Sequence, residues 1–367
     1  MNQIPVVDIG PLFGDDPDSR AATDRRIADA AFDIGFLVVE GHPDGLGVGP
    51  RERWTMLELF DIAEADQRPS WKRNFAPENP HVYRGWFPLA SSPTGGREGF
   101  EIGPDVVRPL PTDQDDDLLY EPTPFPDDAL LPDGWRETAA RYYLGAEHIG
   151  AALLASLSRS LGIDEGIFAR AFDDGISTLR LLHYLARDGA ATHDDGVYVE
   201  HDGRIHEAIT PAHVDSGLLT VLATCGVPGL QAQASTGEWI DVPVVDDGFA
   251  VNFGGLLERW TGGRIRATRH RVLGQGEERY SVPFFFEPRP STVIAPLPLE
   301  GIESFEPFLY GDHLWAVTTK FSENLGLGYL RPPRGPYTDP LAPSTVASTV
   351  ASSSASPSAS VESVSGE

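Results

Sequence analysis

Short strand-like segments fill the second half of the chain, and they limit the possible folds more than any other feature. From Ser177 onward, runs rich in Val, Leu, Phe and Thr alternate with turns that contain Gly or Pro. Many short strands separated by such turns are typical of a β-sandwich or jelly roll. We expect these strands over residues 178–184, 218–223, 229–234, 238–242, 249–253, 268–272 and 280–287. The sequence therefore predicts a mainly β core with α-helices packed outside it.

Helical patterns lie mostly before this β region. Apolar residues at steps of three and four mark the longest helix, which should pack against the strands as a support. These residues are Tyr142, Ala146, Ile149, Leu153, Leu157 and Leu161. Residues 1–130 are expected to form a mixed α/β region, and residues 131–330 the helical support and the β core. In the first region we expect strands over 4–9 and 36–39, helices over 18–33 and 51–67, and a loop with short strands over 69–126.

Two further segments differ in character from their surroundings. Residues 186–210 form an insertion, in which 197–200 and 204–206 flank a turn and predict a β-hairpin. Pro, Ser, Thr, Ala and Val dominate residues 331–367, which bury too little apolar surface to offset the entropy of ordering them. We therefore expect a disordered tail from residue 331 onward.

Charge and cysteine content exclude several classes of partner and site. With 28 basic and 55 acidic side chains the formal net charge is -27 at pH 7, so phosphate backbones and anionic membranes are repelled. Cys225 is the only cysteine, which rules out an intramolecular disulfide and a multi-cysteine metal site. The sequence has no signal-peptide pattern and no apolar run long enough to span a bilayer. We expect a cytoplasmic protein that binds a small molecule rather than nucleic acid or a membrane, in an oligomeric state that the sequence does not define.

The strongest chemical signal is the tripeptide His213-Val214-Asp215. On an extended strand, residues two apart point to the same face, so this imidazole and this carboxylate can bind one metal ion. His270 lies on a later expected strand and is the candidate third ligand; His213, Asp215 and His270 are called the triad below. Two histidines and one carboxylate are the ligand set of non-haem Fe(II) oxygenases. The tripeptide alone would most often be a surface pair, so its interpretation depends on the residues that follow.

Those residues are Arg279-Tyr280-Ser281 on the next expected strand. Arg279 and Ser281 share a face there, and together they offer a guanidinium fork and a hydroxyl to one carboxylate. The alternative is that Arg279 is a surface ion-pair residue.

The order of the triad and of Arg279-x-Ser281 resembles the isopenicillin N synthase-like branch of the 2-oxoglutarate/Fe(II)-dependent dioxygenases. The resemblance spans about residues 4–330 and implies a distorted double-stranded β-helix, a jelly roll whose open mouth holds the iron. By this resemblance the triad would bind Fe(II), with O2 and the co-substrate 2-oxoglutarate at the open positions. Arg279 and Ser281 would hold the distal carboxylate of 2-oxoglutarate, joined by Tyr184. Flanking similarity is found in Ile4-Pro5-Val6-Val7-Asp8-Ile9, Leu179-Arg180-Leu181-Leu182-His183-Tyr184, Gly229-Leu230-Gln231 and Gly237-Glu238-Trp239.

The activity that the resemblance implies is oxidation of an unactivated C–H bond in a small organic metabolite, amino-acid-derived or specialised. 2-Oxoglutarate would be decarboxylated to succinate and CO2, and hydroxylation, desaturation and cyclisation all remain open as outcomes. One alternative is an Fe(II)/O2 oxidase of the same fold that does not use 2-oxoglutarate, because isopenicillin N synthase shares these motifs. Another is a non-catalytic jelly-roll binding module, which the intact triad disfavours.

Candidate substrate residues come from the N-terminal region, which related enzymes place over the mouth of the site. Arg84, Trp86 and Phe100 are expected to face the substrate. Arg84 either binds an anionic group of that substrate or forms a structural ion pair. Asn252 either lines the pocket or fills the core, and we favour the core.

Overall fold

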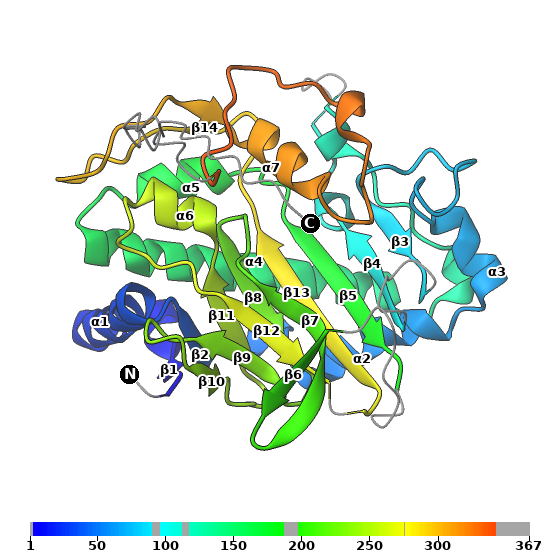
Figure 1. Cartoon of the computed structure of the whole chain (residues 1–367), viewed down its shortest axis with the longest axis horizontal. Helices are drawn as coiled ribbons and strands as arrows, with labels where there is room; N and C mark the ends of the chain where they lie inside the picture. Colours follow the sequence, from blue (N-terminus) through cyan, green and yellow to red (C-terminus); the bar gives the residue numbers. More distant parts are fainter. Residues whose placement is uncertain (1–2, 90–95, 112–116, 187–196, 275, 343–367) are drawn as a thin grey trace, which may run out of the picture.

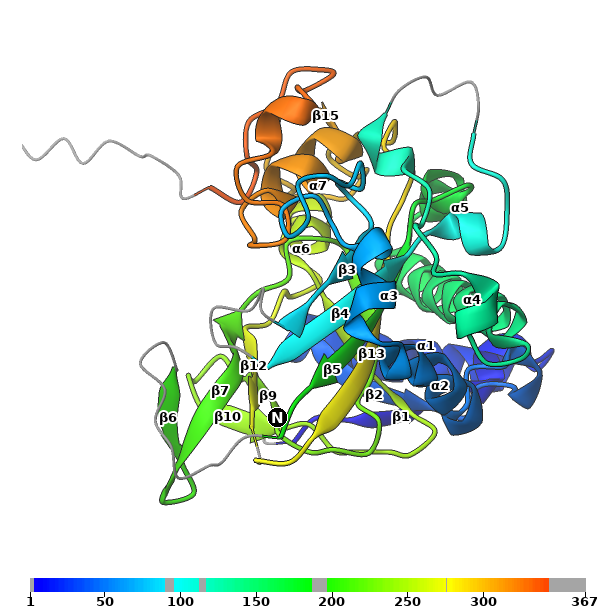
Figure 2. The same cartoon turned by 90° about the vertical axis from the view of Figure 1, so that its right-hand side faces the viewer.

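Two facing β-sheets form the centre of the molecule, and the long helices cover the outer face of the larger one (Figure 1). The computed structural model describes residues 3–89, 96–111, 117–186, 197–274 and 276–342. Seen from the side, helices lie on one side of the larger sheet and the smaller sheet lies on the other (Figure 2). The mainly β architecture with flanking helices that the sequence predicted is therefore confirmed.

The larger sheet draws its strands from both halves of the chain. They are β1 (Val6–Asp8), β2 (Phe36–Glu40), β3 (Gly85–Phe87), β4 (Arg97–Ile102), β5 (Thr178–Tyr184), β8 (Leu219–Ala223), β11 (Phe249–Phe253) and β13 (Arg279–Phe286). Across the sheet they follow the order β1-β2-β11-β8-β13-β5-β4-β3. The pair β1 and β2 is parallel, and the other neighbours in this sheet are antiparallel.

The smaller sheet comes from the region between β5 and β13. Its strands are β6 (Tyr198–His201), β7 (Arg204–His213), β9 (Leu230–Gln233), β10 (Trp239–Asp241) and β12 (His270–Leu273). They follow the order β10-β9-β12-β7-β6, and a separate ribbon pairs β14 (Val293–Ile294) with β15 (Phe308–Leu309). The hairpin of β6 and β7 projects from this sheet (Figure 2), which confirms the predicted hairpin; residues 187–196 of the insertion lie outside the described residues.

The helices are α1 (Pro17–Asp33), α2 (Pro50–Leu57), α3 (Glu64–Gln67), α4 (Trp135–Leu161), α5 (Gly166–Phe172), α6 (Gly255–Trp260) and α7 (Tyr310–Thr318). The longest, α4, packs against α1, α2, β8 and β13, as its apolar stripe predicted. It ends at Gly162, whose φ of 69° is the left-handed conformation that glycine adopts without strain. No helix within the described ranges is both long and apolar enough to cross a membrane.

One expected helix is wrong as a single element. The segment 51–67 is divided into α2, a 3-10 turn over Glu58–Asp61, and α3. Ile62 and Ala63 are extended between the last two pieces. Phe60 packs there on the rings of Trp86 and His183, so tertiary contacts override the local helical pattern.

The larger sheet has two faces that carry different side chains. Strand residues alternate between faces, and on β5 Leu179 and Leu181 join the large core shared with the helices. Leu182 and Tyr184 point the other way and cluster with Phe87 of β3. This second face, opposite the helices, is called the inner face below.

The structure corrects the expected start of the tail. Arg331 is 4 % exposed, and its guanidinium pairs with the buried carboxylates of Asp117 and Asp312. Tyr337 contacts His313 of α7 through its hydroxyl. Residues 331–342 are therefore part of the packed body, because these side chains anchor them, and residues 343–367 lie outside the described residues.

Candidate metal centre

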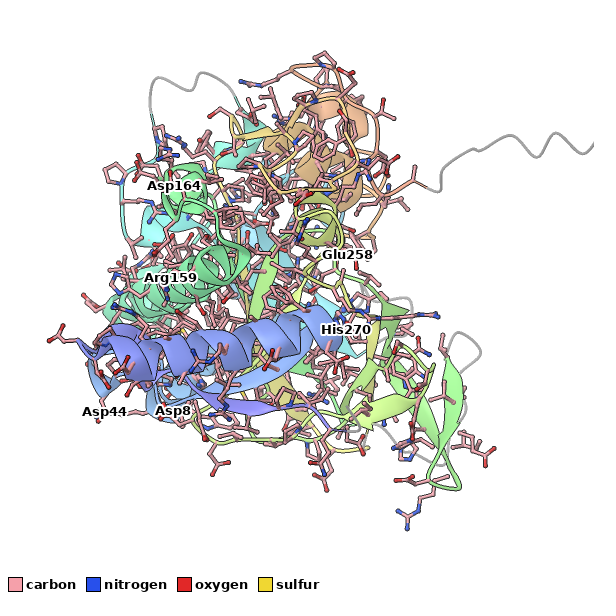
Figure 3. All side chains as sticks on the ribbon, turned by 90° about the vertical axis from the view of Figure 1, so that its left-hand side faces the viewer. Asp8, Asp44, Arg159, Asp164, Glu258 and His270 are labelled. Carbon is pink, nitrogen blue, oxygen red and sulfur yellow. The ribbon has the colours of Figure 1, made fainter. Side chains whose placement is uncertain are left out.

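The triad is assembled by strand pairing in the smaller sheet. His213 is the last residue of β7 and His270 the first of β12, and the two are Cα partners across the antiparallel pair. Asp215 follows β7 two residues later. In Figure 3, His270 lies on the side of the molecule formed by the smaller sheet, away from Arg159 near the end of α4. The structure thus brings together the three residues that the sequence singled out.

Ligand atoms of the triad converge. Oδ1 of Asp215 lies 3.4 Å from Nε2 of His213 and 3.8 Å from Nε2 of His270. One such atom from each residue lies within 4.8 Å of the others, and the two imidazole centroids are 4.3 Å apart. This donor set of two imidazole nitrogens and one carboxylate oxygen fits Fe(II) with positions left open.

Backbone carbonyls select the ring nitrogen that each histidine presents. Nδ1 of His213 lies 2.9 Å from the carbonyl oxygen of Pro211, and Nδ1 of His270 lies 3.0 Å from that of Thr268. Because a carbonyl only accepts, both Nδ1 atoms carry the proton, and both Nε2 lone pairs are free for a metal ion.

Asp215 is oriented by two donors on neighbouring strands. Oδ2 accepts hydrogen bonds from Oγ1 of Thr220 at 2.7 Å and from Nδ2 of Asn252 at 2.8 Å. This leaves Oδ1 for the metal position. Asn252 is buried, as expected of a core residue, and its amide in addition orients a residue of the candidate site; Thr220 carried no sequence signal at all.

A close backbone approach fixes the loop that carries Asp215. The amide of Gly255 donates to the carbonyl of Asp215 at 2.7 Å, and that of Gly254 donates to Leu218 at 2.8 Å. A Cβ at Gly254 would lie 2.2 Å from the carbonyl oxygen of Gly217. Only glycine allows β11 and α6 to meet this loop so closely.

Electrostatics keep the carboxylate ionised. Burial raises the pKa of Asp215, but the interactions of the carboxylate with His270, His213 and Asn252 outweigh burial and hold that pKa well below its usual range. Burial lowers the pKa of His270. For His213, burial and the charge of Arg97 lower the pKa, while Asp215 raises it above the ordinary value overall.

The residues expected to bind the co-substrate lie together on the inner face. Arg279 and Ser281 are the Cα partners of Tyr184 and Leu182. Cζ of Arg279 lies 5.7 Å from the centroid of the Tyr184 ring. Nη1 of Arg279 donates to the carbonyl of Pro228 at 3.3 Å, and its Nε has no hydrogen-bond partner among the described residues.

The three expected substrate residues are not brought to this face. The rings of Trp86 and Phe100 belong to the core shared with the helices, and Nε1 of Trp86 donates to Glu98 at 3.1 Å. Arg84 is 1 % exposed and donates to the side chain of Thr178 and the carbonyl of Ile176. This corrects the expected set of substrate residues. On β3 it is Phe87, the residue after Trp86, whose ring clusters with Tyr184.

Comparison with known proteins agrees with this geometry. A sequence model of the 2OG-Fe(II) oxygenase superfamily matches residues 179–288, which include the triad and Arg279. The 2-oxoglutarate-dependent dioxygenase traH of Penicillium crustosum is 30% identical over 301 residues, 77% of this chain and 84% of the relative. Isopenicillin N synthase of Penicillium chrysogenum is 27% identical over 322 residues, 85% of this chain and 93% of the relative.

Solved structures show the same fold. A full-length Neurospora crassa protein, crystallised in complex with alpha-KG and thymine, superimposes with a TM-score of 0.67 at 22% identity, covering 87% of this chain and 97% of that one. The double-stranded β-helix that the sequence predicted is confirmed by this likeness, and members of the family use Fe(II), 2-oxoglutarate and O2. With its curated relatives, its fold and its converging triad, this chain belongs to the 2-oxoglutarate/Fe(II)-dependent oxygenases and is an oxidoreductase of that family.

Proposed function

We propose that this chain is a dioxygenase that uses 2-oxoglutarate to oxidise an unactivated C–H bond of a small organic molecule, an amino-acid-derived or other specialised metabolite. The triad would hold Fe(II). Arg279, with Ser281 and Tyr184 beside it, would hold the distal carboxylate of 2-oxoglutarate. Hydroxylation, desaturation and cyclisation use the same components.

The observation that carries this proposal is the state of Arg279. It is 4 % exposed, and within the described ranges no carboxylate pairs with its guanidinium. Burial lowers its pKa, which reflects the cost of an unpaired charge in this position. A carboxylate of the co-substrate would remove that cost through charge-assisted hydrogen bonds. The anionic co-substrate would also need such a local cation in order to enter a protein whose net charge is -27.

When bound by these residues, Fe(II) and 2-oxoglutarate would together supply the oxidation. In a hydroxylation, one oxygen atom of O2 would enter succinate and the other the product, with release of CO2. The chain's own residues orient the metal ligand Asp215 and shield the surroundings of Arg279 from water. Thr220 and Asn252 hold one oxygen of Asp215, so the other keeps its place. Phe87 and Leu182 cluster with Tyr184 and exclude water beside Arg279.

A second candidate is an oxidase that uses Fe(II) and O2 without 2-oxoglutarate. The matches to isopenicillin N synthase favour it, because they cover 93% of that relative. In such an enzyme Arg279 would hold a carboxylate of the substrate itself. The oriented triad disfavours a non-catalytic binding module. A protein that binds no metal would not need the hydrogen bonds that present Nε2 of His213 and His270 and Oδ1 of Asp215 to one position.

The test is an anaerobic titration of the full chain with Fe(II) and then with 2-oxoglutarate, followed by the visible metal-to-ligand charge-transfer band. His270→Ala should abolish the band, because one of the three ligand atoms is lost. Arg279→Ala should keep Fe(II) binding but raise the 2-oxoglutarate concentration at half-maximal absorbance by about 10- to 100-fold, the value of hydrogen bonds to a charged group. Trp86→Phe is the control and should change neither step, since this ring faces the helices.

The outcomes separate the candidates. A band in the wild type that responds to Arg279→Ala supports the proposal. Fe(II) binding without a band at saturating 2-oxoglutarate contradicts it and favours the oxidase. Absence of Fe(II) binding by the wild-type chain would contradict both and favour the binding module.

A further inference from the structure

Arg97 lies in line with the residues proposed to hold 2-oxoglutarate. It begins β4 and is the Cα partner of Tyr184 on β5, which is in turn the Cα partner of Arg279 on β13. Cross-strand partners point to the same face of a sheet. Because neighbouring strands lie about 4.8 Å apart, the Cα atoms of Arg97 and Arg279 are roughly 10 Å apart on the inner face.

The guanidinium of Arg97 is only partly engaged by the protein. Nη2 donates to Oε1 of Glu323 at 3.2 Å, and Cζ lies 5.7 Å from the centroid of the Phe87 ring. Nε is buried and has no hydrogen-bond partner in the part of the chain that the structure describes. The side chain of Arg97 is 26 % exposed and that of Glu323 is 9 % exposed, so the arginine is the member of the pair that a ligand can reach.

Positive charge exceeds negative charge in the partly buried group of side chains around Arg97. Lys72 and Arg180 both pair with Glu101, whereas Arg97 pairs with Glu323. Burial raises the pKa of Glu101, but Lys72 and Arg180 hold it at about 2. Burial likewise raises the pKa of Glu323, and Arg180 and Arg97 lower it below the ordinary value overall. Three cations thus face two ionised carboxylates, and the excess charge is unfavourable in a partly buried place unless an anion compensates it.

We infer that Arg97 selects the substrate of this site by binding a carboxylate group of that substrate. The guanidinium donors that Glu323 does not use would make this contact. This inference rests on the proposed function, because it assigns a substrate group to the same site. Arg97 thereby replaces Arg84 as the residue expected to bind an anionic group of the substrate, because Arg84 is held in the core by Thr178 and Ile176. A carboxylate at Arg97 and another at Arg279 lie on opposite sides of Tyr184, so substrate and co-substrate do not compete.

The test compares carboxylates with their uncharged primary amides. The probes are phenylacetate and phenylacetamide, hexanoate and hexanamide, and N-acetylleucine and its amide. Each is titrated calorimetrically into the full chain loaded with Mn(II) and saturating 2-oxoglutarate, so that binding is measured without turnover. The variants are Arg97→Ala, Arg97→Lys and, as the matched control, Arg68→Ala, whose guanidinium forms an exposed pair with Glu78.

We expect at least one carboxylate to bind the wild-type chain about tenfold or more tightly than its amide. Arg97→Ala should abolish that preference, Arg97→Lys should keep part of it, and Arg68→Ala should leave it intact. The affinity for 2-oxoglutarate should be the same in all four proteins. A preference that survives in Arg97→Ala, or the lack of any preference in the wild type, would overturn the inference.

Failure of the proposed function gives a different result. If 2-oxoglutarate does not bind, the same probes are titrated with Mn(II) alone into Arg279→Ala and into the same variant with Arg97→Ala added, because Arg180 of the same group is also partly exposed. A carboxylate preference that is present in Arg279→Ala and lost when Arg97→Ala is added supports the role of Arg97 whichever co-substrate the enzyme uses. A preference that persists in the double variant, or the lack of one in Arg279→Ala, overturns that role.

Discussion

The side-chain amide of Asn252 donates a 2.8 Å hydrogen bond to Oδ2 of Asp215, so the protein holds this carboxylate oxygen and leaves the other for the metal position. Thr220 donates to the same oxygen, so Oδ1 is the oxygen that faces the two imidazoles. Donors that orient a metal-binding group contribute to metal affinity without touching the metal. Asn252 is therefore a positioning residue.

Replacing this amide should weaken metal binding and leave the fold intact. We expect Asn252→Ala to lower the affinity for Fe(II) by roughly 10- to 100-fold, because the carboxylate is then free to rotate. Anaerobic titration with Fe(II) or Co(II) measures the change. Asn79→Ala is the control, since that amide only binds loop carbonyls at Arg68, Pro69 and Trp71. Equal affinities in wild type and Asn252→Ala would show that Thr220 alone orients Asp215.

A buried carboxyl elsewhere in the core should make stability depend on pH. Glu287 follows β13 and is 7 % exposed. Burial raises its pKa to about 7, although Arg84 favours the ionised form. In the unfolded chain the pKa of a glutamate is about 4.3. The folded state therefore binds more protons between these two values, and its stability falls as the pH rises through that window.

Glu287→Gln removes this titration while keeping the shape of the side chain. We expect the free energy of unfolding of Glu287→Gln, relative to wild type, to rise by roughly 2–3 kcal/mol between about pH 5 and about pH 8. Urea unfolding of both proteins at several pH values measures the difference, in which the titration of other groups cancels. A constant difference across this range would mean that Glu287 ionises as readily in the fold as outside it.

The buried pair of Arg331 with Asp117 and Asp312 should stabilise the protein far more than an exposed pair. Arg331→Ala leaves the buried carboxylate of Asp312 without its cation and that of Asp117 with only Arg334 at 3.4 Å, and it should cost about 3–5 kcal/mol in unfolding free energy. Arg170→Ala is the matched control, because its pair with Asp164 has side chains that are 70% and 67% exposed. That change should cost about 0–1 kcal/mol. Similar denaturant midpoints for the two variants would contradict this ranking.

Local patterns in the sequence identified the mainly β core, and the order of the motifs, with the family resemblance that they carry, identified the double-stranded β-helix and the triad. Alternating apolar segments gave the range of β5, Thr178–Tyr184, as the structure has it. His213 and Asp215 lie two residues apart in the sequence, and His270, the first residue of β12, lies within 268–272, which was already expected to be a strand. Period-two spacing is a property of neighbouring residues, so the grouping of His213 with Asp215 needed no knowledge of distant contacts, whereas His270 was added by the order of the motifs.

Tertiary structure decided which faces and which distant residues form the site. Trp86 and Phe87 are adjacent, and only the pairing of β3 with β4 places Phe87 on the inner face. A shift of one residue reverses the two sides of a strand, so composition alone could not make this choice. Asn252 reaches Asp215 across 37 residues and Arg331 reaches Asp117 across 214. Such contacts exist only after the sheets have formed, because chain folding and not local propensity brings these side chains together.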